Sequence, residues 1–193
     1  MININLDEYL LDIDALRNLV RYQTAPRVSK ESVAEHSFFV TSYVLKLHDY
    51  YDFDLAKALK MAILHDFSEV FISDVPHPIK KRFPKFEKEL NEAEYQINKE
   101  YIGEDFANDL NEFNECTSIE GIMVALADVL SVVSYAKYEM ELGNSKYMRN
   151  VYNRSKDRYR GLIQQADKYL RNNFTSFDII KYVESFMDAK YNT

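Results

Sequence analysis

The sequence predicts an all-α fold, and three observations support this prediction. Apolar residues recur every three to four positions along nearly the whole chain, as they do on the buried face of a helix. Glycine and proline number four each among 193 residues, and no segment of useful length alternates apolar with polar residues as a half-buried strand does. Helices are expected at about residues 7–22, 32–49, 54–71, 85–101, 105–115, 118–142, 145–171 and 176–190.

Residues that favour helix ends mark several of these boundaries. Ser32 and Glu35 have the spacing of a capping box, in which each side chain accepts a hydrogen bond from the other residue's backbone N–H. Other residues suited to helix ends are Asp54 and Ser118 at the start and Gly143 and Asn144 at the end of a helix. Pro76 and Pro78 cannot both continue a helix, so a stiff loop is expected over residues 74–78.

Length and charge limit the classes of function. A chain of 193 residues with 47% hydrophobic content can bury one core, so residues 1–193 are expected to form a single domain. The net charge of -7 argues against binding of a nucleic-acid polymer, because that binding needs clustered lysine and arginine. A small phosphorylated substrate is compatible with this charge, since a metal ion and one or two basic side chains can create a local positive site.

Cysteine content and apolar segments indicate the compartment. Cys116 is the single cysteine, so an intrachain disulfide is excluded and a reducing, cytoplasmic location is expected. The first residues intersperse acids among apolar residues, unlike a signal peptide. No apolar stretch is expected to be long enough to cross a bilayer, so no membrane partner is predicted.

Two carboxylates extend the apolar face of the helix expected at 54–71. An apolar stripe runs from Leu55 to Ala62, and the same spacing continues to Asp66 and Glu69. A bare carboxylate directed at the core costs several kcal/mol unless it is neutralised, paired or bound to a cation. A metal ion is one such partner; an ion pair or a frayed helix end explains this helix equally well.

Asp128 is a clearer case of a carboxylate that needs a partner in the core. It is the sole charged residue between Gly121 and Ala136, in a helix apolar enough to be buried nearly all round. An aspartate in that position needs a cation or hydrogen-bond donors. A metal ion explains it better than a solvated surface does, and a buried arginine is the alternative partner.

Two histidines complete a set of metal-ligating side chains. His36 lies in the first turn of its helix and should face inward, although an inward histidine taken alone also fits a hydrogen-bonded core residue. His65 and Asp66 are adjacent and diverge by about 100° on a helix, so they can contact one ion from two sides. Two imidazoles and two carboxylates suit Mn, Co, Fe, Ni or Zn better than an all-oxygen Mg or Ca site. One metal ion is expected, because only His48 and His77 remain for a second site.

These residues resemble, in order and spacing, the motif of the HD superfamily of metal-dependent phosphohydrolases. The matching segments are Glu35-His36-Ser37, His65-Asp66-Phe67-Ser68-Glu69 and Ala127-Asp128. Within the superfamily the chain looks like the bacterial 5'-deoxynucleotidases. They share the run from His65 to Lys80 and an arginine–aromatic pair before the first histidine, here Arg21-Tyr22. The resemblance covers residues 10–145.

The resemblance implies an all-α HD-domain helical bundle that forms a homodimer and hydrolyses deoxyribonucleoside 5'-monophosphates to nucleoside and phosphate. It implies Co or Mn as effective metals, with Mg, Fe, Ni and Zn as alternatives. The residues that it assigns by position are His36, His65, Asp66 and Asp128 to the metal, Arg21 to the phosphate, Glu69 and Asp74 to proton transfer, and Tyr22, Glu69, Asp74, Val75, Pro76 and His77 to the substrate. Tyr22 replaces a tryptophan and His77 a threonine of the best-known members, which leaves sugar and base preference open.

Two other functions fit the same motif. Relatives in the superfamily release triphosphate, or remove phosphates stepwise, from nucleoside or nucleoside-analogue triphosphates, and extra basic residues over the pocket would favour that chemistry. The second alternative is a nucleotide-binding regulatory module that keeps the metal without turnover, although intact Glu69 and Asp74 argue against it. Without the resemblance, Arg21 would be interpreted as a solvated charge near a helix end.

Overall fold

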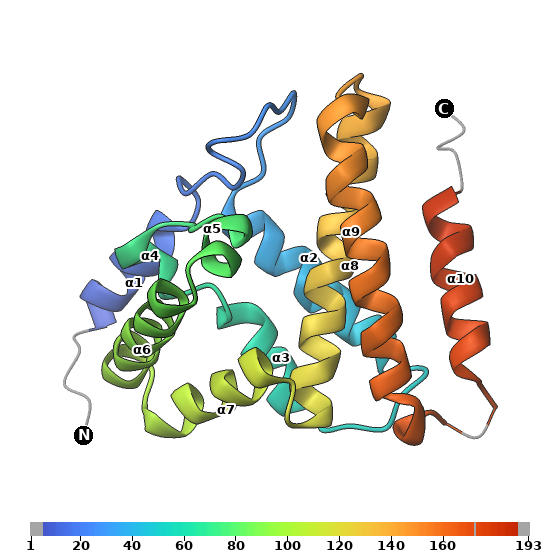
Figure 1. Ribbon diagram of the computed structural model, residues 1–193. Helices are drawn as coiled ribbons and strands as arrows, with labels where there is room; N and C mark the ends of the chain where they lie inside the picture. The colour runs from blue at the N-terminus through green and yellow to red at the C-terminus, as the bar shows by residue number, and fades with distance from the viewer. Residues whose placement is uncertain (1–5, 172, 189–193) are drawn as a thin grey trace.

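The computed structural model describes residues 6–171 and 173–188, and these residues form helices joined by turns and loops (Figure 1). The predicted all-α fold is confirmed; β-structure within the described residues is limited to isolated bridges, Val20 with Ser32 and Tyr51 with Leu170. The helices are α1 (Leu6–Ala15), α2 (Val33–Leu47), α3 (Leu55–Leu64), α4 (Glu69–Ile72), α5 (His77–Arg82), α6 (Pro84–Tyr101), α7 (Glu104–Glu115), α8 (Ile119–Glu141), α9 (Ser145–Gln165), a 3-10 turn (Asp167–Tyr169) and α10 (Ser176–Asp188).

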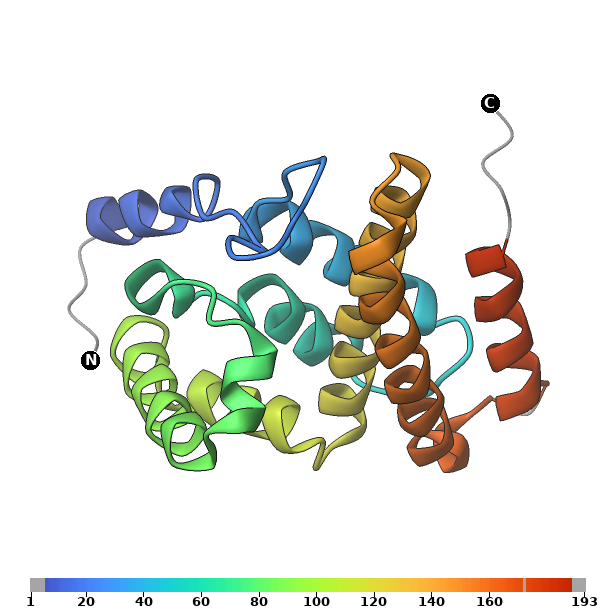
Figure 2. The same cartoon turned by 45° about the horizontal axis from the view of Figure 1, so that its top comes forward.

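Helix α8 is the centre of the bundle, and its neighbours α2, α3, α7 and α9 pack around it. Figures 1 and 2 show α8 and α9 side by side as an antiparallel hairpin, with α10 beside α9. Every residue from Gly121 to Ala127 is buried, and these side chains join the buried faces of α2 and α3 in one hydrophobic core. The position of Asp128 next to this buried run places its carboxylate close to α2.

Helix α8 also meets the length and apolar composition of a membrane span, so the expectation that no apolar stretch is long enough is wrong. Of the 18-residue window with this composition, 67% is buried inside the bundle. A helix that other helices surround needs apolar side chains on most of its circumference, which accounts for the composition without a bilayer.

The prediction of a single helix over residues 54–71 is wrong, because the structure has two helices there, and the break between them lies at the metal centre. Helix α3 ends at Leu64, residues 65–68 form turns, and α4 then begins at Glu69. The turns bury the Phe67 side chain completely while the Asp66 carboxylate stays beside His65. Residues 65–68 contain neither glycine nor proline, so nothing in their composition signalled the break.

Other expected boundaries differ by smaller amounts. The first helix ends at Ala15 instead of residue 22, and α9 ends at Gln165 instead of residue 171. The stiff loop ends at Pro76, because the next residues form the short helix α5, which was not predicted. Residues 189–190 of the last expected helix lie outside the described residues.

Candidate metal centre

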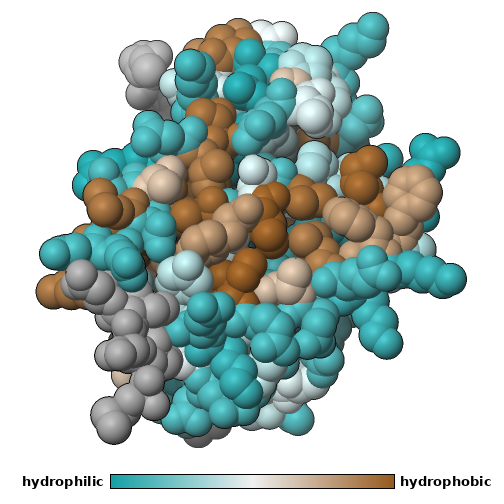
Figure 3. Space-filling model, turned by 90° about the vertical axis from the view of Figure 1, so that its left-hand side faces the viewer, coloured by the Kyte–Doolittle hydropathy of each residue, from teal (hydrophilic) through white to brown (hydrophobic). Residues whose placement is uncertain are grey.

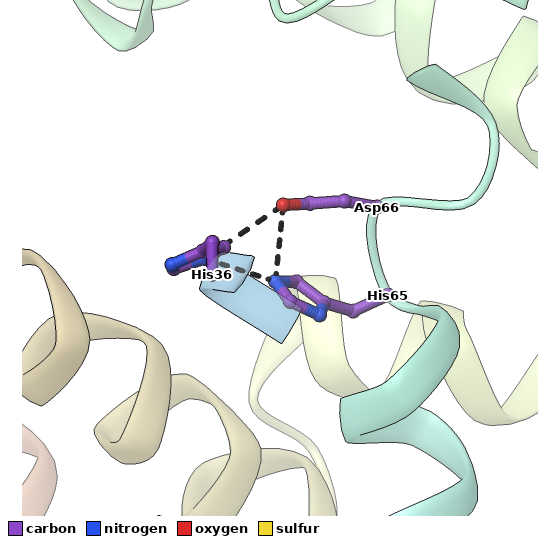
Figure 4. A group of neighbouring side chains, drawn as sticks. All are labelled: His36, His65 and Asp66. Atoms are coloured by element: carbon purple, nitrogen blue, oxygen red, sulfur yellow. Dashed lines mark hydrogen bonds and ion pairs between the residues drawn. The ribbon is translucent and has the colours of Figure 1, made fainter. Parts of the chain in front are cut away.

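Three predicted ligands converge on one point in the structure. The rings of His36 and His65 point toward one another, and the Asp66 carboxylate lies beside both (Figure 4). The two Nε2 atoms are 3.3 Å apart, and Oδ2 of Asp66 lies 3.2 Å from Nε2 of His65 and 3.7 Å from Nε2 of His36. One ligand atom from each residue thus lies within 4.8 Å of the others, a spacing that a single ion can bridge.

The fourth predicted ligand, Asp128, adjoins this group from α8. Its Oδ1 lies 3.2 Å from Nε2 of His36. Among the described residues, the arginine in an ion pair with Asp128 is Arg158, 3.9 Å away, and its side chain is 49% exposed rather than buried. Asp128 therefore remains available to a cation between the helices.

Local structure on α2 and α3 positions the two histidines. The capping box predicted for Ser32 and Glu35 is present, and it fixes the first turn of α2, from which His36 points inward. His65 occupies the C-terminal cap of α3, where the helix stops and the chain turns. The two rings thus come from segments that are distant in sequence and packed side by side.

The Nδ1 atom of each imidazole, which is the ring nitrogen not directed at the other ligands, makes a hydrogen bond that orients the ring. Nδ1 of His65 lies 2.9 Å from the carbonyl oxygen of Ala62, which can only accept, so Nδ1 carries the proton and Nε2 keeps a lone pair. Nδ1 of His36 lies 3.0 Å from Oγ of Ser131, one turn beyond Asp128 on α8. Such outer hydrogen bonds orient histidine rings for metal coordination.

The protonation of these groups suits a metal ligand set. Burial lowers the pKa of His36 to about 4, and the charge of Arg21 acts in the same direction, so the ring is neutral at neutral pH. Burial alone would raise the pKa of Asp66, but the neighbouring His65, His36 and Arg21 hold it below its usual range. The site therefore presents a neutral His36 ring and an ionised Asp66 carboxylate. Burial alone would lower the pKa of His65, but the charge of Asp66 raises it, so a divalent metal that binds there displaces the His65 proton.

A third carboxylate next to these groups lacks a partner. Oε2 of Glu69 is buried and accepts no hydrogen bond from any described residue. Burial raises the pKa of Glu69 to about 10, and repulsion from Asp66 and Asp74 adds to this effect. A buried polar atom left without a partner is costly, so its persistence here points to a ligand that completes the site. The donor set and this atom together fit one bound divalent ion.

The predicted phosphate and substrate residues lie on the connection between α1 and α2 and on the segment from the start of α4 to the start of α5. Nη1 of Arg21 lies 3.1 Å from Oε2 of Glu31, and both side chains are largely buried. The backbone N–H of Tyr22 donates to Oδ2 of Asp74 across 3.3 Å, which joins the two loops. Tyr22 adopts a left-handed backbone with φ of 57°.

Several side chains of α8 fasten the connection that carries Arg21 and Tyr22. The Tyr22 ring stacks on Tyr135, with centroids 5.0 Å apart and planes 13° apart. The buried carboxylate of Glu139 accepts the backbone N–H groups of Val28 and Ser29 at 2.8 and 2.5 Å. This fastening holds the connection against the same helix that supplies Asp128.

Sequence reasoning missed some of the residues that support the site. Only the tertiary structure brings to the site Glu31, which precedes α2, and the helical residues Ser131, Tyr135 and Arg158. Of the predicted loop residues, Val75 and Pro76 are half-buried, whereas the side chain of His77 is exposed at the start of α5. The sequence offered one signal for these residues: Ser131 is a polar residue one turn after Asp128 in an otherwise apolar helix.

Comparison with known proteins agrees with these observations. The family model of the YfbR-like 5'-deoxynucleotidases matches residues 8–177. A 5'-deoxynucleotidase of Pasteurella multocida (strain Pm70) is 27% identical over 157 residues, which make up 75% of this chain and 80% of the relative.

Solved structures share the fold over nearly the full length. A protein of Pyrococcus horikoshii OT3 has 28% identity and a TM-score of 0.75, over 93% of this chain and 99% of that chain. An HD-domain phosphohydrolase of Listeria innocua has 21% identity and a TM-score of 0.75, over 97% of this chain and 92% of that chain. The chain therefore belongs to the family of YfbR-like 5'-deoxynucleotidases and has the HD-domain fold, as the sequence motif predicted.

Proposed function

We propose that this protein hydrolyses the 5'-phosphate of deoxyribonucleoside monophosphates with one divalent metal ion held by His36, His65, Asp66 and Asp128. The observation that carries the proposal is the convergence of two imidazole Nε2 atoms and two carboxylates on one point. Membership of the 5'-deoxynucleotidase family supports the choice of reaction and substrate.

The metal is proposed to be Co or Mn. Mixed nitrogen and oxygen donors suit a transition ion better than Mg or Ca, and Fe, Ni and Zn are the alternatives that the same donors would accept. When bound, the ion supplies Lewis-acid stabilisation of the negative charge that develops on the phosphoryl oxygens.

The protein's own groups serve the rest of the reaction. In the hydrolysis a water oxygen bonds to phosphorus, the bond between phosphorus and the 5'-oxygen breaks, and the 5'-oxygen takes up a proton. Glu69 and Asp74, on adjacent segments beside Asp66, are proposed to exchange these protons. The guanidinium of Arg21, fixed by Glu31, is proposed to orient the phosphate and stabilise its charge.

The nucleoside is proposed to bind between the Arg21-Tyr22 connection and the loop after α4. The hydrogen bond from the Tyr22 backbone to Asp74 supports this placement, because it holds the two segments together. Tyr22, Val75, Pro76 and His77 would line this pocket. Stacking on Tyr135 fixes the Tyr22 ring and restricts the sugar and base that fit beside it.

We also propose that the protein works as a homodimer in the cytoplasm, on a free nucleotide rather than a nucleic-acid polymer. Figure 3 shows a band of apolar side chains across the face seen from the left of Figure 1. Exposed apolar residues of the elements on that side are Leu6, Leu10 and Leu11 of α1, Phe71 of α4 and Phe86 of α6. Such a surface is suited to contact between proteins. Light scattering coupled to size-exclusion chromatography would distinguish a dimer from a monomer.

The direct test of the reaction is a substrate panel. Metal-stripped protein is supplied with Mn or Co and then with dAMP, AMP or dATP, and phosphate, pyrophosphate and triphosphate are separated by chromatography. We expect phosphate from dAMP and little from AMP. Release of triphosphate from dATP alone would replace the proposal with a triphosphohydrolase, and the absence of any metal-dependent product would reject hydrolysis of these nucleotides.

A further inference from the structure

Arg158 of α9 adjoins the metal centre but has no part in the reaction described above. Its Nη1 lies 3.9 Å from Oδ2 of Asp128, and 49% of its side chain is exposed. Helix α9 packs along α8, which presents Asp128 to α2. Arg158 is therefore a cation at the rim of the site, open on one side to solvent and in contact on the other with a proposed metal ligand.

The charge of Arg158 also reaches the loop proposed to hold the nucleoside. Burial lowers the pKa of His77, and among the charged groups Arg158 makes the largest contribution to lowering it further. The same guanidinium thus acts on Asp128 of the metal centre and on His77 of the segment proposed to hold the nucleoside. A group in that position can contact the phosphate of a nucleotide that spans the two.

The other cations at the site already have carboxylate partners. Arg21 is paired with Glu31 at 3.1 Å, and Lys80 is paired with Glu94 at 3.3 Å. Among the described residues, the ion pair of Arg158 within 4.0 Å is with Asp128 alone. A metal ion bound to Asp128 would take up that negative charge and release the guanidinium for another anion.

A count of the charges at the site shows why a released cation matters. The two positive charges of the ion are balanced by Asp66 and Asp128, while Asp74, and Glu69 when ionised, add negative charge that repels a phosphate dianion. Arg158 offsets this repulsion from the rim. Its planar guanidinium can also donate two parallel hydrogen bonds to phosphoryl oxygens.

We infer that Arg158 is a second phosphate-binding residue, which contacts a phosphoryl oxygen of the monophosphate substrate and of the phosphate product once the metal is bound. The inference rests on the proposed function for the identity of the substrate.

The test measures binding of inorganic phosphate to the Mn-loaded protein by calorimetry, which needs no turnover. Arg158→Gln should weaken phosphate binding by tenfold or more, and Arg158→Lys should restore part of it, while the affinity for Mn stays within about twofold of wild type. Arg149→Gln is the matched control. It removes the same charge from an exposed position nine residues earlier on α9, about 180° round the helix, and should change neither affinity.

Three outcomes would overturn the inference. Unchanged phosphate affinity in Arg158→Gln, or no phosphate binding by the wild type, would remove Arg158 from the phosphate site. A parallel loss of Mn affinity would make Arg158 a residue that positions Asp128. If the wild type binds phosphate, Arg158→Gln does not, and dAMP is still not hydrolysed, the inference stands and the proposed reaction fails.

Discussion

Two residues beside the proposed substrate site have backbone conformations that L-amino acids rarely adopt. Tyr22 has φ of 57° and its N–H donates to Asp74, and Ser73, with φ of 65°, directly precedes Asp74. Such conformations persist only where the surrounding structure enforces them, and they concentrate at functional sites. The strain here fixes the direction of the Asp74 carboxylate, because the Tyr22 N–H donates to it.

Ser73→Gly should stabilise the protein. Glycine adopts φ of 65° without a Cβ clash, and the exposed Ser73 side chain gives up little packing. The relief of about 1–2 kcal/mol exceeds the entropy that glycine adds to the unfolded chain, so the free energy of unfolding should rise by about 0.5–1 kcal/mol. Urea denaturation measures this change. Ser73→Ala keeps the Cβ and should give no gain; an equal gain would contradict the explanation.

At the scale of residues, the sequence was informative where a polar group interrupted an apolar pattern. Asp128 was predictable because a lone charge in a buried helix needs a partner, and Asp66 because it continued an apolar stripe. Glu31 gave no such signal, since glutamate is common on solvated surfaces, and the position of Ser131 one turn from Asp128 gave only a weaker one. Their contacts with Arg21 and His36 depend on packing between segments distant in sequence.

At Gly121, helix α8 lies close against the backbone of α7. A Cβ at this position would lie 2.4 Å from the carbonyl oxygen of Glu112, a backbone atom that cannot move aside easily. Gly121→Ala should therefore lower the free energy of unfolding, by about 1–3 kcal/mol.

Gly161→Ala on α9 is the matched control, because a Cβ there meets no atom within 4 Å. Alanine should raise stability by about 0.5–1 kcal/mol at this helical position. Thermal unfolding of both variants compares the two sites. A tolerated Gly121→Ala would mean that α7 and α8 are not packed as closely as the structure describes.

The free energy of unfolding should depend on pH through Glu139 of α8, whose carboxylate accepts hydrogen bonds from the α1–α2 connection. Burial alone would raise the pKa of this carboxyl, but hydrogen bonds from Asn144, Val28 and Ser29 hold it below the usual value of 4.5. A pKa lowered on folding adds stability above the unfolded value, and this stability is lost as the pH falls through the folded value.

Thermal unfolding at a series of pH values measures this contribution. The melting temperature of the wild type should fall more steeply below about pH 4.5 than that of Glu139→Gln, which should also be less stable at neutral pH, by about 1–3 kcal/mol. An identical dependence of melting temperature on pH in the two proteins would show that the hydrogen bonds to Glu139 do not lower its pKa on folding.

At the scale of elements, long amphipathic helices were predictable and local breaks were not. The ends of α8 were predicted within a residue, because Ser118 caps one end and Gly143 follows the other. The break after Leu64 has no such residue, and it arises because the turn buries Phe67 while keeping Asp66 at the metal centre. Tertiary contacts overrode a helical pattern at the site itself, where such overrides are expected.

In the whole molecule, the proposed ion joins α2, the segment after α3, and α8, and both α2 and α8 contribute side chains to the hydrophobic core. A ligand that binds only the folded state stabilises it by mass action. At a Mn concentration one hundred times its dissociation constant, the gain should be about 2.7 kcal/mol. Differential scanning calorimetry should show a higher melting temperature with Mn than with EDTA. Asp66→Asn should remove most of this difference; a full difference in that variant would place the ion elsewhere.

The most direct test of the central claim is a titration of metal-stripped protein with Mn while dAMP hydrolysis is followed. One ion at His36, His65, Asp66 and Asp128 predicts no activity without metal, a linear rise, and a plateau at about one equivalent of Mn per chain. Asp128→Asn should flatten this curve. Hydrolysis by the metal-free protein, or a plateau at about two equivalents per chain, would contradict a single-ion centre.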